Sequence, residues 1–149
     1  MKALFLDIDD VLNSGKTRQR FGIDYIDPEK CEHLNRICQD TGTSIVVSSD
    51  WRIEGIYGYE KTKVALQSAG FTVPIVGCTP EHDWLKREHP RSGEIRAWLD
   101  SHPEVRTYAI LDDLDIVGHG RHFVKVGRKG LDSSHCRRLR EILTCSTSP

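Results

Sequence analysis

The amino-acid sequence predicts an α/β fold built around a mostly parallel sheet. Short apolar runs alternate with amphipathic stretches along the chain, and the amphipathic stretches repeat their apolar residues with helical spacing. This alternation is typical of parallel strands joined by crossover helices. Five strands are expected, at residues 3–6, 44–47, 73–76, 108–111 and 123–126. The first, second and fourth are almost entirely apolar, as expected of strands covered on both faces.

The four helices expected between and after these strands carry sequence signals for their ends. Asp27-Pro28 provides an N-cap followed by proline at the first helical position, and Gly42 supplies a left-handed stop. A second helix ends at Gly70 in the same way. A third stops before Pro103, and a fourth is capped at residue 132 or 133.

The size and charge of the chain indicate one ordinary domain. We expect its 149 residues to form a single domain at 1–143, followed by a flexible tail at 144–149. Apolar residues make up 38% and charged residues 29%, as in soluble globular proteins. The formal net charge of −1 argues against bulk attraction to nucleic acid or to an anionic membrane.

The cysteines and the N-terminus predict a cytoplasmic protein without a membrane anchor. The five cysteines are odd in number and include no C-x-x-C pair, which favours free thiols over disulfides or a zinc site. The apolar stretch near the N-terminus meets Asp7 too early to be a signal peptide. No apolar run approaches the roughly 20 residues that a membrane-spanning helix needs.

Clustered aspartates follow two of the most apolar strands. Asp7, Asp9 and Asp10 come after the first strand, and Asp112 and Asp113 come after the fourth. Parallel strands end at the same edge of a sheet, so these carboxylates are expected to converge there. Crowded carboxylates resist ionising together unless a cation lies among them, and Mg2+ prefers oxygen ligands. Aspartates also begin turns, but two such groups favour a Mg2+ site.

Several motifs resemble those of the haloacid dehalogenase (HAD) superfamily of phosphohydrolases. Residues 6–13 (Leu-Asp-Ile-Asp-Asp-Val-Leu-Asn) resemble its first motif, an apolar strand followed by Asp-x-Asp. Residues 46–48 and 110–113 resemble its second and fourth motifs. Residues 48–52 and 91–99 resemble more closely a small capless subgroup that is associated with nucleic-acid repair.

The resemblance implies a three-layer Rossmann-like fold and a Mg2+-dependent phosphatase that forms an aspartyl-phosphate. It covers nearly the whole chain. The stretches 11–47 and 49–90 are too short to hold an independent cap domain besides their expected strands and helices. We therefore expect an open site that accepts phosphorylated nucleic-acid ends or other bulky substrates as well as small phosphate esters.

The resemblance also implies a role for each motif residue. Asp7 matches the nucleophile, and Asp9 matches the general acid that later activates water. Ser48 matches the residue that hydrogen-bonds a phosphoryl oxygen. Asp112 and Asp113 match the acidic motif that binds the metal, together with the carboxylate of Asp7 and the main-chain carbonyl of Asp9, and which of the two is the direct ligand stays open.

Three further residues are candidates for substrate contact. Ser49 and Arg52 lie in the segment after the second strand that resembles the capless subgroup. Asp10 stands where related sequences often have glycine, so it adds a negative charge beside the nucleophile. We expect Asp10 to bind the metal, to point to solvent, or to favour a more cationic substrate surface.

The third motif, usually a lysine, has no unambiguous match. A fixed cation is needed because a developing aspartyl-phosphate adds negative charge beside the aspartates. Arg91 is our candidate, since it stands just before the third helix and its planar guanidinium can bridge two oxygens. Lys86, Arg87 and Lys125 are the competitors.

Other side chains bear on the substrate. Residues 121–140 hold seven basic side chains and one acid, and Lys16, Arg18 and Arg20 lie in the presumed flap over the site. They predict either a phosphate-backbone contact or a solvated basic face. Candidates for base stacking, unless they are buried, are Trp51, Trp84 and Tyr57. The loop histidines at 119 and 122 lack a zinc-binding pattern and are expected at the surface.

Two other functions fit parts of this pattern. A two-metal nuclease also gathers carboxylates in an α/β crevice, but it cleaves phosphodiesters. A receiver-like phosphate-binding module carries its acceptor aspartate after the third strand, where residues 77–79 contain no acid. The position of Asp9, two residues after Asp7, argues for turnover.

Overall fold

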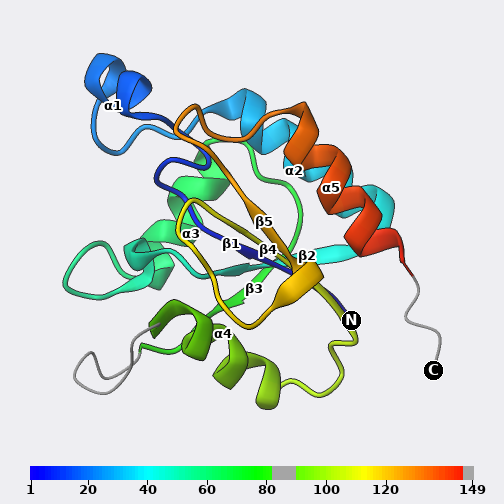
Figure 1. Ribbon diagram of the computed structural model, residues 1–149. Helices are drawn as coiled ribbons and strands as arrows, with labels where there is room; N and C mark the ends of the chain where they lie inside the picture. The colour runs from blue at the N-terminus through cyan, green and yellow to red at the C-terminus, as the bar shows by residue number, and fades with distance from the viewer. Residues whose placement is uncertain (82–89, 146–149) are drawn as a thin grey trace.

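The computed structural model, which describes residues 1–81 and 90–145, has a five-stranded sheet with strand order β3-β2-β1-β4-β5 (Figure 1). Every neighbouring pair of strands is parallel. The strands are β1 (Lys2–Leu6), β2 (Thr43–Val47), β3 (Ile75–Cys78), β4 (Thr107–Asp112) and β5 (Phe123–Lys125). The α/β prediction is confirmed, and the sheet is wholly rather than mostly parallel.

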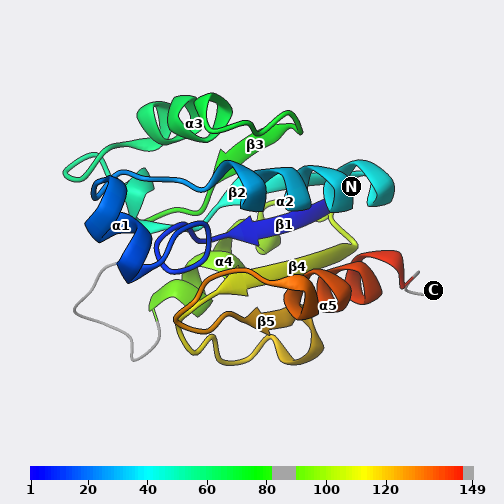
Figure 2. The same ribbon diagram turned by 90° about the horizontal axis from the view of Figure 1, so that it is seen from above.

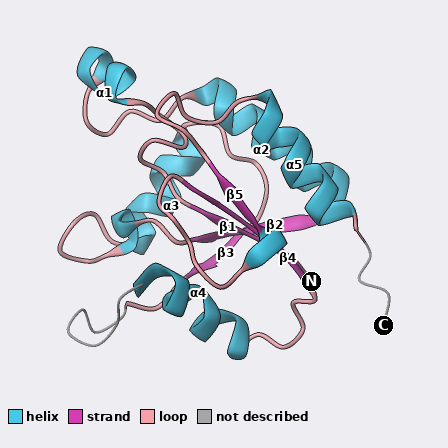
Figure 3. Cartoon of the chain, viewed as in Figure 1, coloured by secondary structure: helices cyan, strands magenta, loops and turns pink. Residues whose placement is uncertain are grey.

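Helices flank the sheet on both faces, which gives the three-layer Rossmann-like arrangement expected (Figures 1 and 3). In the described residues they are α1 (Gly15–Phe21), α2 (Pro28–Thr41), α3 (Tyr59–Ser68), α4 (Pro90–Asp100) and α5 (Ser133–Thr144), with 3-10 turns η1 (Asp50–Arg52) and η2 (Gly120–His122). As predicted, the side chain of Asp27 caps α2, and Gly42 ends it with φ 67°. None of these helices is long and apolar enough to cross a membrane.

The two faces of the sheet are covered unequally. The larger apolar cluster lies under α2 and α5 and includes Leu4 and Leu6 of β1. The smaller cluster lies on the opposite face, where Trp98 of α4 packs edge-on against Phe5 with 5.3 Å between ring centroids. Residues that alternate along β1 therefore point to opposite cores, as the side-chain period of a strand requires.

Two elements differ from the prediction. β3 begins at Ile75 rather than at residue 73, because Pro74 has no N–H to donate and the register of the β2–β3 pair shifts at this point. Helix α1 was not predicted. It buries none of its side chains and depends on a local capping box in which Ser14 and Thr17 bond each other's backbone, so it has no apolar stripe to reveal it.

The register of the central strands determines which residues reach the carboxyl edge of the sheet together. Leu6 pairs with Val47 on one side and with Leu111 on the other. The next residues of β1 and β2 and the end of β4 therefore meet at the carboxyl edge, where α1 also lies (Figure 2). Within residues 1–81 and 90–145, the connections between strands hold the helices given above and no inserted cap domain.

Candidate active site

Asp7, Ser48 and Asp112 lie side by side at the carboxyl edge of the sheet. The backbone N–H of Asp7 donates to the carbonyl of Leu111 at 3.1 Å, and that of Ser48 donates to Leu6 at 3.0 Å. The sheet ladder thus continues one residue past the strands. These backbone hydrogen bonds fix the positions from which the side chains of the first, second and fourth motifs extend.

Three carboxylates form a compact cluster at this edge. One oxygen each of Asp7, Asp112 and Asp113 lies within 4.8 Å of the others. Asp7 is 4% exposed and Asp112 is fully buried. Burial raises the pKa of both carboxyls, and the charge of Asp112 raises the pKa of Asp7 further. A set of oxygen donors whose two buried members, Asp7 and Asp112, resist ionising together fits a hard divalent cation such as Mg2+.

Arg91, near the start of α4, contacts this cluster. Its Nη1 lies 3.2 Å from Asp7 Oδ1 and 2.9 Å from Asp112 Oδ2. Burial acts to lower the pKa of Arg91, but the charges of Asp7 and Asp112 outweigh it and raise the pKa, so the guanidinium stays charged. The competitor Lys125 instead pairs with exposed Asp115 at 2.6 Å. Lys86 and Arg87 lie outside the described residues.

Ser48 has a buried hydroxyl without a partner. Its side chain is fully buried, and its Oγ makes no hydrogen bond to any described residue. The same holds for Oγ1 of Thr79, just after β3, which sequence reasoning passed over because residues 77–79 contain no acid. An unmade buried hydrogen bond costs about 1–3 kcal/mol. Both hydroxyls are therefore suited to an incoming acceptor such as a phosphoryl oxygen.

Asp9 is held at the mouth of the site by two donors. Its Oδ1 accepts from Asn13 Nδ2 and its Oδ2 accepts from the indole N–H of Trp51, both at 3.1 Å. The side chain remains 49% exposed. Trp51 is buried, so it orients Asp9 rather than offering a ring for base stacking. Tyr57 packs against Trp51 and donates to Asp24, and Trp84 lies outside the described residues.

Asp10 is not a member of the three-carboxylate cluster. Its backbone is left-handed, with φ 61°, the conformation that favours glycine. Asn13 Oδ1 accepts its backbone N–H at 2.8 Å, and its carboxylate pairs with Nη2 of Arg18 at 3.1 Å. Of the roles expected for Asp10, metal binding is the one that this geometry does not favour.

The geometry of Arg52 and Ser49 argues against the substrate contacts expected of them. The Arg52 side chain is 1% exposed, and its Nη2 is 2.9 Å from Glu94 Oε2. Its other donors point at the backbone carbonyls of residues 48, 49, 79 and 80. The Ser49 hydroxyl accepts from the backbone N–H of Trp51 at 3.3 Å, at the start of η1. Both side chains hold the loop after β2.

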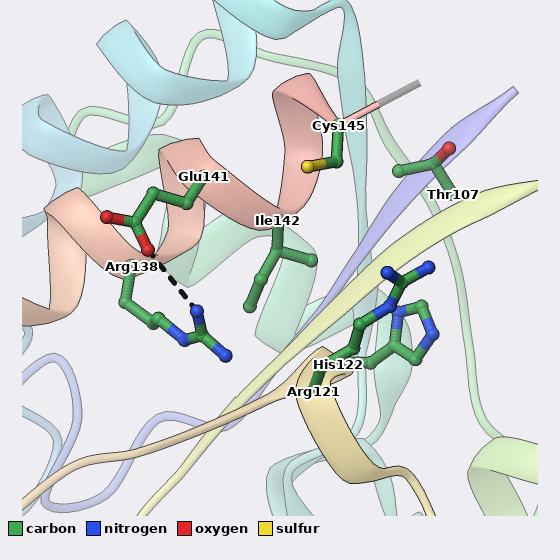
Figure 4. Close-up of a pocket in the computed structure, with 7 residues that line it drawn as sticks. All are labelled: Thr107, Arg121, His122, Arg138, Glu141, Ile142 and Cys145. Atoms are coloured by element: carbon green, nitrogen blue, oxygen red, sulfur yellow. Dashed lines mark hydrogen bonds and ion pairs between the residues drawn. The ribbon is translucent and has the colours of Figure 1, made fainter. Parts of the chain in front are cut away.

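The basic side chains of residues 121–140 do not form one surface. Arg128 and Lys129 line a groove beside Asp10. Lys125 pairs with Asp115, and Arg140 pairs with Asp40 at 2.7 Å. Arg121 and Arg138 line a pocket of about 270 Å3, in which Arg138 pairs with Glu141 (Figure 4). Thr107 and His122, which stand where β4 and β5 begin, place this pocket at the opposite, amino edge of the sheet.

His119 is buried, contrary to the surface position expected. It is 3% exposed, and its Nε2 lies 3.2 Å from the carbonyl oxygen of Ser92 in α4. Its Nδ1 lies 3.1 Å from the hydroxyl of Tyr108. Burial lowers the pKa of His119, which keeps the ring neutral. The loop that carries it therefore closes onto the first turn of α4, next to Arg91.

The fold and these residues define a class of protein. A parallel α/β sheet with an Asp-x-Asp after β1, a serine after β2 and an aspartate pair at the end of β4 is the arrangement of HAD-type phosphohydrolases. A family model described as "HAD domain in Swiss Army Knife RNA repair proteins" matches residues 3–136, and the chain belongs to this family. Searches of curated proteins and of solved structures gave no match.

Proposed function

We propose that the protein is a Mg2+-dependent phosphatase that hydrolyses phosphate monoesters through an aspartyl-phosphate at Asp7. The observation that carries this proposal is the contact of one guanidinium, Arg91, with both Asp7 and Asp112 inside a buried carboxylate cluster. The association of the family with RNA repair and the lack of a cap within the described ranges support phosphorylated nucleic-acid ends as substrates.

The first half of the reaction transfers the phosphoryl group to Asp7. A carboxylate oxygen of Asp7 attacks phosphorus while Arg91 holds this carboxylate in place and balances part of the added negative charge. The unpartnered hydroxyl of Ser48 donates to a phosphoryl oxygen. Asp9, oriented by Trp51 and Asn13, gives a proton to the leaving oxygen as its bond to phosphorus breaks.

The second half releases phosphate. Asp9, now a carboxylate, takes a proton from a water molecule, whose oxygen attacks the phosphorus of the aspartyl-phosphate. The bond between phosphorus and the Asp7 oxygen breaks, and inorganic phosphate and free Asp7 result. Mg2+ bound by Asp7, by Asp112 with Asp113 and by the Asp9 carbonyl would supply further positive charge to the phosphoryl oxygens.

The test is phosphate release by the wild type and by Asp7→Asn. Wild-type protein should hydrolyse an aryl phosphate in Mg2+ and lose this activity with a chelator. Asp7→Asn should lower turnover by at least about 10,000-fold, because an amide is a poor nucleophile. Since burial raises the pKa of Asp7, the neutral amide should leave the metal-free protein at least as stable, as measured by thermal unfolding.

The matched control is Asp115→Asn, which makes the same change at an exposed aspartate paired with Lys125. It should leave turnover unchanged. Near-normal turnover by Asp7→Asn, with deamidation excluded by mass spectrometry, would contradict covalent catalysis at this residue. Full activity after exhaustive metal removal would contradict the metal requirement, and cleavage of internal phosphodiesters without phosphate release would indicate a nuclease.

A further inference from the structure

A basic groove lies between α1 and the loop that follows β5. Figure 2 shows α1 at the carboxyl edge of the sheet. The groove encloses about 710 Å3 and is lined by Asp10, Lys16, Arg18, Arg128 and Lys129, among others. We propose that this groove binds a phosphodiester of a nucleic-acid strand whose terminal phosphate lies at Asp7. The proposal rests on the phosphatase function above and adds where the rest of the substrate binds.

The charge in the groove is not balanced by the protein. Arg18 pairs with Asp10, the one acid in its lining. Lys16, Arg128 and Lys129 are exposed, and in the part of the chain that the structure describes their side chains have no carboxylate partner. The chain as a whole has a net charge of −1, so this excess is local. Like charges around one hollow repel each other, and a bound anion would offset that repulsion.

The groove is lined by Asp10, which directly follows the proposed general acid Asp9 in the chain. Arg18, in its wall, reaches back toward the reacting groups, and its Nη1 lies 3.7 Å from Asp9 Oδ1. A leaving group protonated by Asp9 therefore departs beside the groove. A mononucleotide brings no second phosphate to this place, whereas a strand brings the phosphodiester next to its terminal phosphate. The geometry thus favours a strand over a small phosphate ester.

The wall formed by the loop after β5 is fixed to the loop that carries Asp9. Leu131 donates from its backbone to the carbonyl of Val11 at 2.9 Å. Gly130 has φ 79°, and a Cβ there would lie 2.8 Å from the carbonyl oxygen of Asn13, so only glycine fits this approach. The backbone that carries Arg128 and Lys129, just before Gly130, is therefore held beside the site before any substrate arrives, which lowers the entropy lost on binding.

The experiment compares two substrates with the Mg2+-loaded protein. One is a ten-nucleotide single-stranded RNA with a terminal phosphate, tested separately at the 3′ and the 5′ end, and the other is an aryl phosphate. Arg128→Gln combined with Lys129→Gln should raise the KM for the RNA at least about tenfold. It should also make the slope of log kcat/KM against log salt shallower by about 0.7, the value for one lost phosphate contact on a single strand. Turnover of the aryl phosphate should stay unchanged.

Arg121→Gln is the matched control, because it removes a similar exposed charge at the opposite edge of the sheet (Figure 4). It should alter neither the KM nor the salt slope. An unchanged KM and slope in the Arg128/Lys129 variant, or an equal loss on both substrates, would overturn the proposal.

A binding measurement separates this proposal from the phosphatase function. Fluorescence anisotropy with the same phosphorylated RNA on the Asp7→Asn background requires no turnover. If the wild type fails to hydrolyse the aryl phosphate, the phosphatase function is wrong. Affinity that falls in the Arg128/Lys129 variant but not in Arg121→Gln still supports the groove in that case, and equal affinity of all three proteins overturns it.

Discussion

Arg52 and Arg91 both insert their guanidinium groups at the carboxyl edge, and both approach the same oxygen of Asp50. Nη1 of Arg52 lies 3.7 Å from this oxygen and Nη2 of Arg91 lies 3.0 Å from it. Their other partners differ. Arg52 faces backbone carbonyls and Glu94, whereas Arg91 faces Asp7 and Asp112.

The role of a buried arginine is indicated by its partners rather than by its burial. Most donors of Arg52 face backbone carbonyls, which are fixed dipoles that do not titrate, so Arg52 holds the loop after β2 in place. Burial raises the pKa of the Asp7 and Asp112 carboxyls beside Arg91, so their charge responds to what binds nearby. The following predictions on Arg52 and Arg91 test this contrast directly, and a third tests the support of α4, the helix that carries Arg91.

The largest expected effect is on stability, in Arg52→Ala. Removing the guanidinium leaves the surrounding carbonyls without their donors and breaks a buried ion pair with Glu94. We expect the free energy of unfolding in urea to fall by about 3–5 kcal/mol. Arg36→Ala, which breaks an exposed pair with Glu32, should change it by about 1 kcal/mol or less. A fall of only about 1 kcal/mol in Arg52→Ala would contradict the structural role of Arg52 and with it the contrast to Arg91.

The next effect is on turnover, in Arg91→Ala. We expect kcat to fall about a hundredfold, which corresponds to about 2.7 kcal/mol of barrier, because one preorganised charge beside Asp7 is lost. Arg91→Lys should recover only part of this, since an ammonium cannot repeat the planar contacts. Lys125→Ala should have little effect, because Lys125 pairs with exposed Asp115. If Lys125→Ala is the damaging change and Arg91→Ala is neutral, the third motif has been assigned to the wrong residue.

The smallest effect concerns the support of α4 by His119. Burial, with smaller contributions from Arg96 and His122, lowers the pKa of His119 below its ordinary 6.5. The unfolded chain therefore binds a proton more readily than the fold does, and stability falls as pH drops below about 6.5. Between pH 7.5 and 5.5 this histidine should contribute a loss of at most about 1.4 kcal/mol, measured by urea unfolding.

The variant that isolates this contribution is His119→Gln. It should be less stable than the wild type at pH 7.5 and should show a weaker dependence on pH. His33→Gln, at a histidine on the outer surface of α2, should keep the wild-type dependence. An identical pH dependence in His119→Gln and the wild type would show that His119 does not titrate with folding.

Sequence reasoning could predict the elements whose signals are local or periodic. The apolar runs of β1, β2 and β4, and the caps at Asp27 and Gly42, reflect burial and backbone geometry that the residues themselves dictate. The convergence of Asp7 with Asp112 and Asp113 followed from the rule that parallel strands end at one edge. Helix α1 was not predicted, because a helix without buried side chains has no periodic apolar pattern in its sequence.

The surroundings of individual side chains could not be predicted. Arg52 meets the carbonyl of Thr79 from 27 residues away, and His119 meets that of Ser92 across a similar separation. Every residue has a backbone carbonyl, so the residue types in the sequence do not indicate which carbonyls will accept a hydrogen bond from a distant side chain. The basic residues 121–140 show the converse, because a run that is continuous in sequence was distributed over two edges and a helix surface once the chain folded.

Because α1 is attached to the fold by polar contacts, ionic strength affects phosphodiester binding in the groove in two ways. This helix contributes no buried side chain, and the Asp10–Arg18 ion pair ties it to the loop beside Asp9. By contrast, α2 and α5 are anchored by apolar packing, which salt does not screen. Rising salt therefore weakens the attraction between the groove and a phosphodiester and, at the same time, promotes local opening of the wall that carries Lys16.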